Sequence, residues 1–168
     1  AEMMGIATHG LKRVATYTAR IEAGGIRAGA TPRVTAPAPA LRQVDGDDGL
    51  GPATARLALR KGIAAARDCG VGAVFLRRGA HLGALAPYLW IAAEAGMAAI
   101  VTTNTAPMLA SAGGREALIG NNPVGLGLPG PKGAHVMLDM ALSVAARSRV
   151  RAAAEMGAEI PDSWATDA

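Results

Sequence analysis

Two of the three histidines in this chain of 168 residues stand beside glycine in short segments, Thr8-His9-Gly10 and Ala80-His81-Leu82-Gly83. An imidazole can donate a proton in one direction of a reaction and accept it in the other near neutral pH. Arg13 lies about one helical turn beyond His9, so we expect the two side chains at the same end of a helix. A guanidinium there could hold a carboxylate through two parallel hydrogen bonds.

These residue types would suit proton transfer on a small carboxylate, but each also has an ordinary structural interpretation. A single histidine beside glycine can be a surface or helix-capping residue. Arg13 could be a solvated charge on a helix. His135 lies inside a predicted strand and matches no motif, so we expect it to be structural. Chemistry alone leaves both interpretations of the other two histidines open.

A glycine pattern at residues 125–130 satisfies G-x-G-x-x-G, the dinucleotide-binding fingerprint. In that fingerprint the glycines open a helix whose N-terminus receives the pyrophosphate. Here they follow a strand, and Pro129 and Pro131 lead into another strand-like run. We therefore reject a Rossmann site and expect a hairpin connection between two strands.

The composition indicates a globular protein, with 51% apolar residues and only 3% aromatic ones. A net charge of +4 could suit nucleic acid, but the basic residues are scattered and no aromatic residues are interleaved with them. Cys69 is the only cysteine, so we expect no disulfide, no cysteine-based metal cluster and no other metal site. We also expect no membrane span and no signal peptide. These features predict a cytoplasmic protein that binds neither nucleic acid nor membrane.

Hydrophobic periodicity and the Gly and Pro positions predict alternating helices and strands. Predicted helices cover residues 11–23, 51–69, 85–95 and 143–156. Predicted strands cover residues 40–44, 71–76, 97–102, 124–128 and 135–139, with an extended stretch at 27–39 and turns at 45–49 and 129–133; the strands at 71–76 and 97–102 are expected to be buried. This order predicts an α/β fold of three layers with a mixed sheet.

Nine segments, in the same order along the chain, resemble motifs of the malate/L-lactate dehydrogenase family. The first, Gly5-Ile6-Ala7-Thr8-His9-Gly10-Leu11-Lys12-Arg13, resembles the family's R-G-I-x-S-H-G-x-x-R segment. The others are Tyr17-Thr18-Ala19-Arg20-Ile21, Val44-Asp45-Gly46-Asp47, Gly79-Ala80-His81-Leu82-Gly83, Thr103-Asn104-Thr105-Ala106-Pro107, Gly113-Gly114-Arg115-Glu116, Gly120-Asn121-Asn122-Pro123, Leu138-Asp139-Met140-Ala141 and Ile160-Pro161-Asp162-Ser163-Trp164-Ala165. Together they are far more specific than the glycine pattern.

The resemblance implies a non-Rossmann, L-sulfolactate dehydrogenase-like nucleotide-binding fold and a hydride transfer. Members of the family reduce 2-oxoacids, or cyclic imines derived from them, with NADH or NADPH. Malate, lactate and ureidoglycolate are among the corresponding 2-hydroxy acids. A small 2-oxoacid substrate, an NAD or NADP cofactor and a homodimer are the partners that the resemblance implies.

The resemblance also implies roles for individual residues. His81 matches the position of the proton acceptor in ureidoglycolate dehydrogenases, and His9 that of the proton donor in diketogulonate reductases. We prefer His81 as the acid/base, with His9 close to the substrate and nicotinamide, and Arg13 and Thr8 as substrate-binding residues. Thr105, Asp139, Met140 and Ala141 match cofactor contacts, although Asp139 could also cap a helix before residues 141–146.

Some residues depart from the family pattern. Thr8 replaces the usual Ser and keeps a hydroxyl, whereas Leu82 replaces Phe and Leu142 replaces a frequent Thr. Ser148-Arg149 stands where Gly-Lys is common. These differences bear on substrate fit and on the choice of cofactor.

Family chains extend past both ends of this one. We therefore interpret residues 1–168 as the central portion of a family domain, without the N-terminal helices and the C-terminal cofactor-binding part. The alternative function is that of a catalytically inactive fragment with only an association role.

Overall fold

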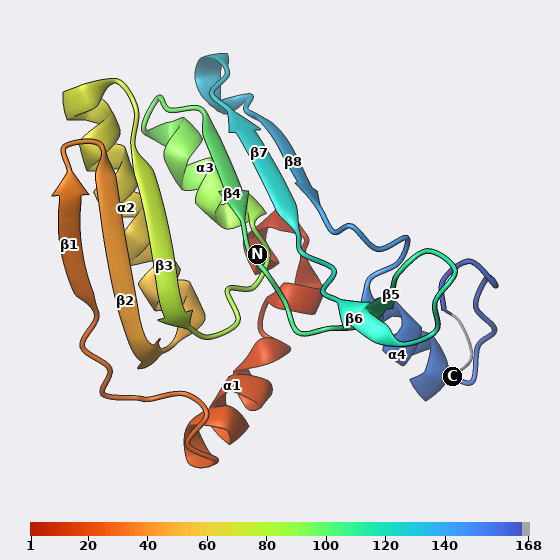
Figure 1. Cartoon of the computed structure of the whole chain (residues 1–168). Coiled ribbons are helices and arrows are strands. Elements are labelled where there is room, and N and C mark those ends of the chain that lie inside the picture. The colour runs from red at the N-terminus through yellow and green to blue at the C-terminus, as the bar shows by residue number, and fades with distance from the viewer. Residues whose placement is uncertain (166–168) are drawn as a thin grey trace.

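A computed structural model describes residues 1–165 as an α/β arrangement (Figure 1). The last three residues of the predicted 1–168 unit lie outside the described part. The α-helices are α1 (Arg13–Glu22), α2 (Gly51–Cys69), α3 (Ala86–Glu94) and α4 (Arg147–Glu155), and the 3-10 turns are η1 (Glu2–Met4), η2 (Ala7–His9) and η3 (Pro131–Gly133). The strands are β1 (Arg33–Ala38), β2 (Leu41–Gly49), β3 (Ala73–Gly79), β4 (Ala99–Thr102), β5 (Leu109–Ala110), β6 (Ala117–Ile119), β7 (Val124–Leu128) and β8 (Val136–Met140). The predicted α/β class is confirmed.

Helix α2 has the bounds that its apolar spacing predicts. Its buried face consists mostly of small residues, among them Ala55, Ala58 and Ala65. Pro52 stands in the first turn, where a missing N–H costs nothing. Gly70 ends the helix in a left-handed conformation with φ of 77°. Small side chains let α2 lie close to the sheet beneath it.

The first sheet is mixed, as predicted. Strand β1 pairs antiparallel with β2, and β2 pairs parallel with β3 after the α2 crossover. The turn predicted at residues 45–49 is wrong, because β2 continues to Gly49 with an irregularity in its pairing. Asp47 and Asp48 adopt positive φ there, which aspartate tolerates, and both carboxylates accept hydrogen bonds from Arg78. The acidic run therefore forms an ion-paired bulge.

The second sheet has the antiparallel order β4-β7-β8, and β5 pairs with β6 separately. No helix begins at Gly127, so the rejection of a Rossmann motif is confirmed. The expected position of the hairpin connection is partly wrong, because Gly125 and Gly127 lie inside β7 and only the residues after Leu128 connect it to β8. Both glycines face α3, where a Cβ would approach Leu89 within about 3 Å.

Helices α2 and α3 lie on the same face of the two sheets, as Figure 1 shows. The opposite face of the strands carries exposed apolar side chains, namely Phe75, Ile100, Leu126, Leu128, Val136, Leu138 and Met140. Ile100 is 73% exposed and its neighbour across β7, Leu138, is 47% exposed. The strands predicted to be buried at 71–76 and 97–102 are therefore buried on one face only, because the described residues place helices on a single side.

The other predicted elements differ from the structure only at their ends, whereas the short strands β5 and β6 were not predicted. Helix α4 begins at Arg147 and not at residue 143, because Ala146 has an extended backbone with ψ of 135°. Within residues 1–165, no helix combines the length and the apolar character needed to cross a membrane.

We expect Gly127→Ala to lower the free energy of unfolding by about 1–3 kcal/mol, the usual cost of overpacking a core. The added methyl group would lie 2.9 Å from Cβ of Leu89, an atom that cannot move without the helix backbone. Urea denaturation would measure the change. Gly29→Ala is the matched control, since nothing lies within 4 Å of a Cβ there. Equal stability of the two variants would contradict the close packing of α3 on β7.

Candidate functional site

Two histidines that are distant in the sequence lie side by side in the structure. His9 ends η2, and His81 follows β3. Their rings stack with centroids 5.6 Å apart and an interplanar angle of 17°. A Cβ at Gly51, the first residue of α2, would clash with the carbonyl oxygens of Ala80 and His81. The glycine thus lets the segment containing His81 pass close to the helix end.

Each of the two imidazoles has a hydroxyl beside its Nδ1 atom. Tyr17 Oη lies 2.9 Å from Nδ1 of His81, and Thr8 Oγ1 lies 3.0 Å from Nδ1 of His9. No role was predicted for Tyr17 from the sequence. A signal was available, because Tyr17 follows Arg13 by four residues and therefore lies on the same face of α1.

Arg13 provides positive charge at the histidine pair. Its Nε donates a hydrogen bond to the backbone carbonyl oxygen of Thr8, 3.0 Å away. Burial lowers the pKa of His81 to about 4, and the positive charge of Arg13 acts in the same direction. Burial and Arg13 also lower the pKa of His9, against the opposing effect of Asp139. Both imidazoles are therefore neutral at pH 7.

Burial raises the pKa of the Tyr17 hydroxyl, against the lowering effects of Arg13 and Arg20. The hydroxyl consequently keeps its proton near neutral pH. The contact with His81 thus joins two uncharged groups, each with one hydrogen to donate. Such a contact can orient a ring without adding charge to it.

Asp139 joins β8 to the start of α3. Its Oδ2 accepts hydrogen bonds from the backbone N–H groups of Leu85 and Ala86, both at 2.8 Å. Asp139 does cap a helix, as considered from the sequence. The helix predicted to be capped was wrong, because the carboxylate caps α3 and not a helix that follows Asp139 in the sequence. The long-range partner could not be recognised from local spacing.

Thr105, one of the residues predicted to contact a cofactor, is held by two asparagines. The Thr105 hydroxyl donates to Oδ1 of Asn121 at 2.8 Å, and the Thr105 N–H donates to Oδ1 of Asn122 at 3.0 Å. The N–H of Leu142, directly after Met140 and Ala141, donates to the carbonyl oxygen of Asn121 at 2.8 Å. Asn121 therefore links the Thr105 loop to the end of β8. Asn121 belongs to a motif that matched the family, but no role was predicted for this residue from the sequence.

The third histidine contacts both the β7–β8 connection and α3. His135 Nδ1 accepts a hydrogen bond from the Gly130 N–H at 3.1 Å, and Nε2 lies 2.8 Å from Oε1 of Glu94. Its ring packs edge-on against Trp90, and its side chain is only 5% exposed. These contacts fasten the β7–β8 connection to α3, in agreement with the structural role that we expected.

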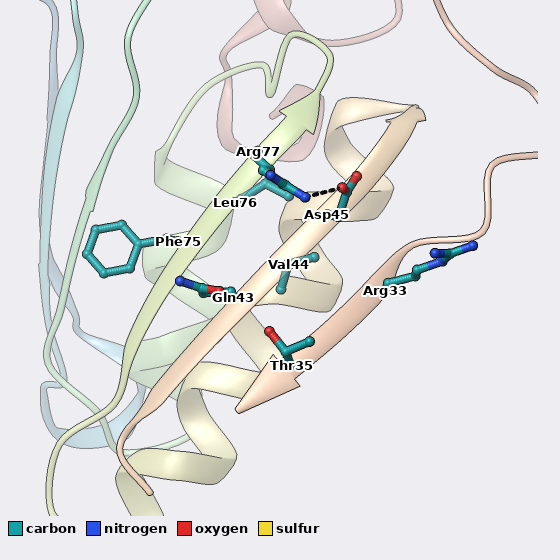
Figure 2. A pocket seen from close by; sticks show the side chains of 8 residues that line it. All are labelled: Arg33, Thr35, Gln43, Val44, Asp45, Phe75, Leu76 and Arg77. Carbon is teal, nitrogen blue, oxygen red and sulfur yellow. Dashed lines mark hydrogen bonds and ion pairs between the residues drawn. The ribbon is translucent and has the colours of Figure 1, made fainter. Parts of the chain in front are cut away.

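A separate hollow of about 250 Å³ lies on the outer face of the first sheet (Figure 2). It is lined by Arg33, Thr35, Gln43, Val44, Asp45, Phe75, Leu76 and Arg77. Arg77 and Asp45 form an ion pair of 2.9 Å at its edge. None of the sequence-predicted site residues lines this hollow.

Comparisons with known proteins test the predicted family resemblance. A family model described as malate/L-lactate dehydrogenase matches residues 1–168. The chain belongs to the malate/L-lactate dehydrogenase family. The predicted resemblance is thereby confirmed.

Relatives in this family are about one third identical to the chain over the aligned residues. A malate dehydrogenase of Pyrococcus abyssi is 36% identical over 165 residues, which are 98% of this chain and 45% of that protein. A pyrroline-2-carboxylate/piperideine-2-carboxylate reductase of Pseudomonas aeruginosa is 34% identical over 96% of this chain and 48% of that protein. The sulfolactate dehydrogenase structure from Methanocaldococcus jannaschii superposes with a TM-score of 0.86 at 32% identity, covering 96% of this chain and 46% of that one. The chain thus spans about half the length of these relatives.

We expect His81 to make the stability of this family member depend on pH. The unfolded chain binds a proton at the ordinary histidine pKa of 6.5, whereas folded His81 does so only near pH 4. Its contribution to stability is thus complete above pH 6.5 and is lost as the pH falls toward 4. Urea denaturation across this range should show a smaller loss for His81→Gln than for the wild type. An unchanged pH dependence would contradict the depressed pKa.

Asp139→Ala should lower the free energy of unfolding by about 0.5–2 kcal/mol, the typical cost of losing an N-cap. The change would leave the N–H groups of Leu85 and Ala86 without their carboxylate acceptor. Asp68→Ala, on the exposed last turn of α2, is the control and should have almost no effect. Thermal and urea unfolding of both variants would test the role of Asp139 as the cap of α3.

Proposed function

We propose that this chain carries the acid/base and substrate-binding residues of an NAD(P)-dependent oxidoreductase. The reaction would transfer a hydride between the nicotinamide and a small 2-oxoacid, its 2-hydroxy acid, or a related cyclic imine. The stacked His9–His81 pair beside Arg13 is the observation that carries this proposal. The names of the family members, which are malate and sulfolactate dehydrogenases and cyclic-imine reductases, support it.

In the reduction, His81 would supply the proton and Arg13 would hold the carboxylate. The Arg13 Nε already donates to Thr8, so its two terminal nitrogens would remain for a bidentate contact. Thr8 keeps a hydroxyl beside His9, and both would line the substrate side of the site. When the carbonyl carbon gains the hydride and the substrate oxygen takes a proton from the protonated form of His81, the product is a 2-hydroxy acid. The reverse reaction returns that proton to the same imidazole.

The cofactor, when bound, supplies or accepts the hydride. Its proposed contacts are Thr105, Asp139, Met140 and Ala141. A further residue of the same segment supports this assignment, because the Oγ atom of Ser143 is buried and has no hydrogen-bond partner among the described residues. A buried hydroxyl of this kind costs free energy unless a polar ligand satisfies it. Ser143 is therefore a suitable additional contact for NAD or NADP.

We also propose a homodimer located in the cytoplasm. The exposed apolar face of β4, β7 and β8 supports association, because contiguous apolar patches of this kind mark interaction sites. A single exposed cysteine, Cys69, suits a reducing compartment. Neither feature depends on the identity of the substrate.

Assays of NAD(P)H oxidation with pyruvate, oxaloacetate, ureidoglycolate and piperideine-2-carboxylate test the reaction. We expect little or no turnover by the 168-residue chain alone, because it spans about half the length of its relatives. Extended to the length of these relatives, it should reduce at least one of the four. Brisk turnover by the short chain would contradict this expectation.

The proposed roles of His81 and Arg13 can be separated kinetically in the extended protein. His81→Ala should lower kcat by roughly 10²-fold or more, the usual contribution of a general acid. Arg13→Ala should chiefly raise KM, because it removes a contact made in both the ground state and the transition state. His135→Gln is the control, since that histidine contacts Glu94 and Gly130 instead. Wild-type rates in both site variants would overturn the assignment.

A further inference from the structure

The Tyr17 hydroxyl contacts two atoms of His81. Oη lies 2.9 Å from the Nδ1 atom of the ring and 3.4 Å from the backbone carbonyl oxygen of the same residue. A hydroxyl has one hydrogen to donate and two lone pairs that accept. It can therefore satisfy both contacts in only one way, by donating to the carbonyl oxygen and accepting from an Nδ1–H group.

We propose that Tyr17 is a positioning residue that keeps a proton on Nδ1 of His81 and so leaves Nε2 as the atom that exchanges protons with the substrate. Nδ1–H donates to Tyr17 Oη, and Tyr17 O–H donates to the His81 carbonyl oxygen. This inference rests on the proposed function for the identity of the substrate. The tautomer itself is a property of the protein alone.

The opposite arrangement would disable a general base. If Tyr17 donated its hydrogen to Nδ1, the neutral ring would carry its own proton on Nε2 and would have no free acceptor facing the substrate. With the proton on Nδ1, Nε2 of the neutral ring can accept a proton from a 2-hydroxy acid, which forms the imidazolium. In the reduction, Nε2 first takes a proton from solvent, and the imidazolium then gives that proton to the 2-oxoacid oxygen. The Nδ1 proton stays in place through both steps, so the transferred proton passes only between solvent, Nε2 and the substrate oxygen.

A tyrosine suits this position because it orients the ring without contributing a negative charge. In many enzymes a third group fixes the base by a hydrogen bond to its other nitrogen. The groups that act on His81 are the cations Arg13 and Arg20 and the imidazole of His9. A neutral hydroxyl leaves that positive environment intact for a carboxylate substrate.

Nitrogen-15 NMR of the histidine side chains tests the assignment in the 168-residue chain, without cofactor or substrate. Long-range proton–nitrogen correlations distinguish a protonated ring nitrogen from an unprotonated one, and His9→Gln and His135→Gln identify the signals of His81 by elimination. Near pH 7, the Nδ1 of His81 should carry the proton, which is the tautomer that free histidine disfavours. An unprotonated Nδ1 in the wild type would overturn the inference.

Two tyrosine variants provide the matched comparison. Tyr17→Phe should shift His81 toward the Nε2–H tautomer. Tyr88→Phe removes another hydroxyl from the same region, one that donates to the carbonyl oxygen of Leu82 at 2.6 Å, and should leave the His81 signals as in the wild type.

Identical His81 signals in Tyr17→Phe and the wild type would refute the role of Tyr17. If the Tyr17 variant does not fold, the wild-type tautomer alone decides the question. A chain that has the Nδ1–H tautomer but, at the length of its relatives, transfers no hydride would contradict the proposed function and leave the tautomer assignment standing.

Discussion

The hydrogen bonds from the start of α3 to Asp139 are the constraint on which the site depends. One carboxylate oxygen accepts two backbone N–H groups, which joins the end of β8 to the first residues of α3. The segment containing His81 leads directly into this helix end. Glycines 125 and 127 allow α3 to lie close enough to β7 for this contact. The cap thereby connects the second sheet to the segment that carries the histidine.

The charges around the histidine pair favour neutral imidazoles and an anionic ligand. Burial and the cations of α1 lower the pKa of His81, and burial and Arg13 lower that of His9. A carboxylate would enter this positive environment with a favourable interaction and would also offset part of the charge that depresses the two pKa values. Substrate binding and the proton affinity of the imidazoles are therefore physically coupled in the proposed reaction.

The two faces of the sheets differ in what covers them. The inner face packs against α2 and α3, whose buried residues are mostly alanines, whereas the outer face carries exposed leucine, isoleucine, valine and phenylalanine side chains. Apolar area of this extent is unfavourable in water. The length of the family members, about twice that of this chain, and the proposed dimer each offer a way to cover it.

The sequence by itself determined the local elements and the family. Helix α2, the β7–β8 hairpin and the failure of the glycine pattern followed from periodicity and from Gly and Pro, which act over a few residues. Only the tertiary structure decided the partners of Tyr17 and Asp139, because those contacts join residues 64, 54 and 53 positions apart. The acidic bulge likewise depended on Arg78 from another strand. Spacing along a chain predicts which residues share one face of a helix or strand. Long-range contacts depend on how the elements pack, which local spacing does not predict.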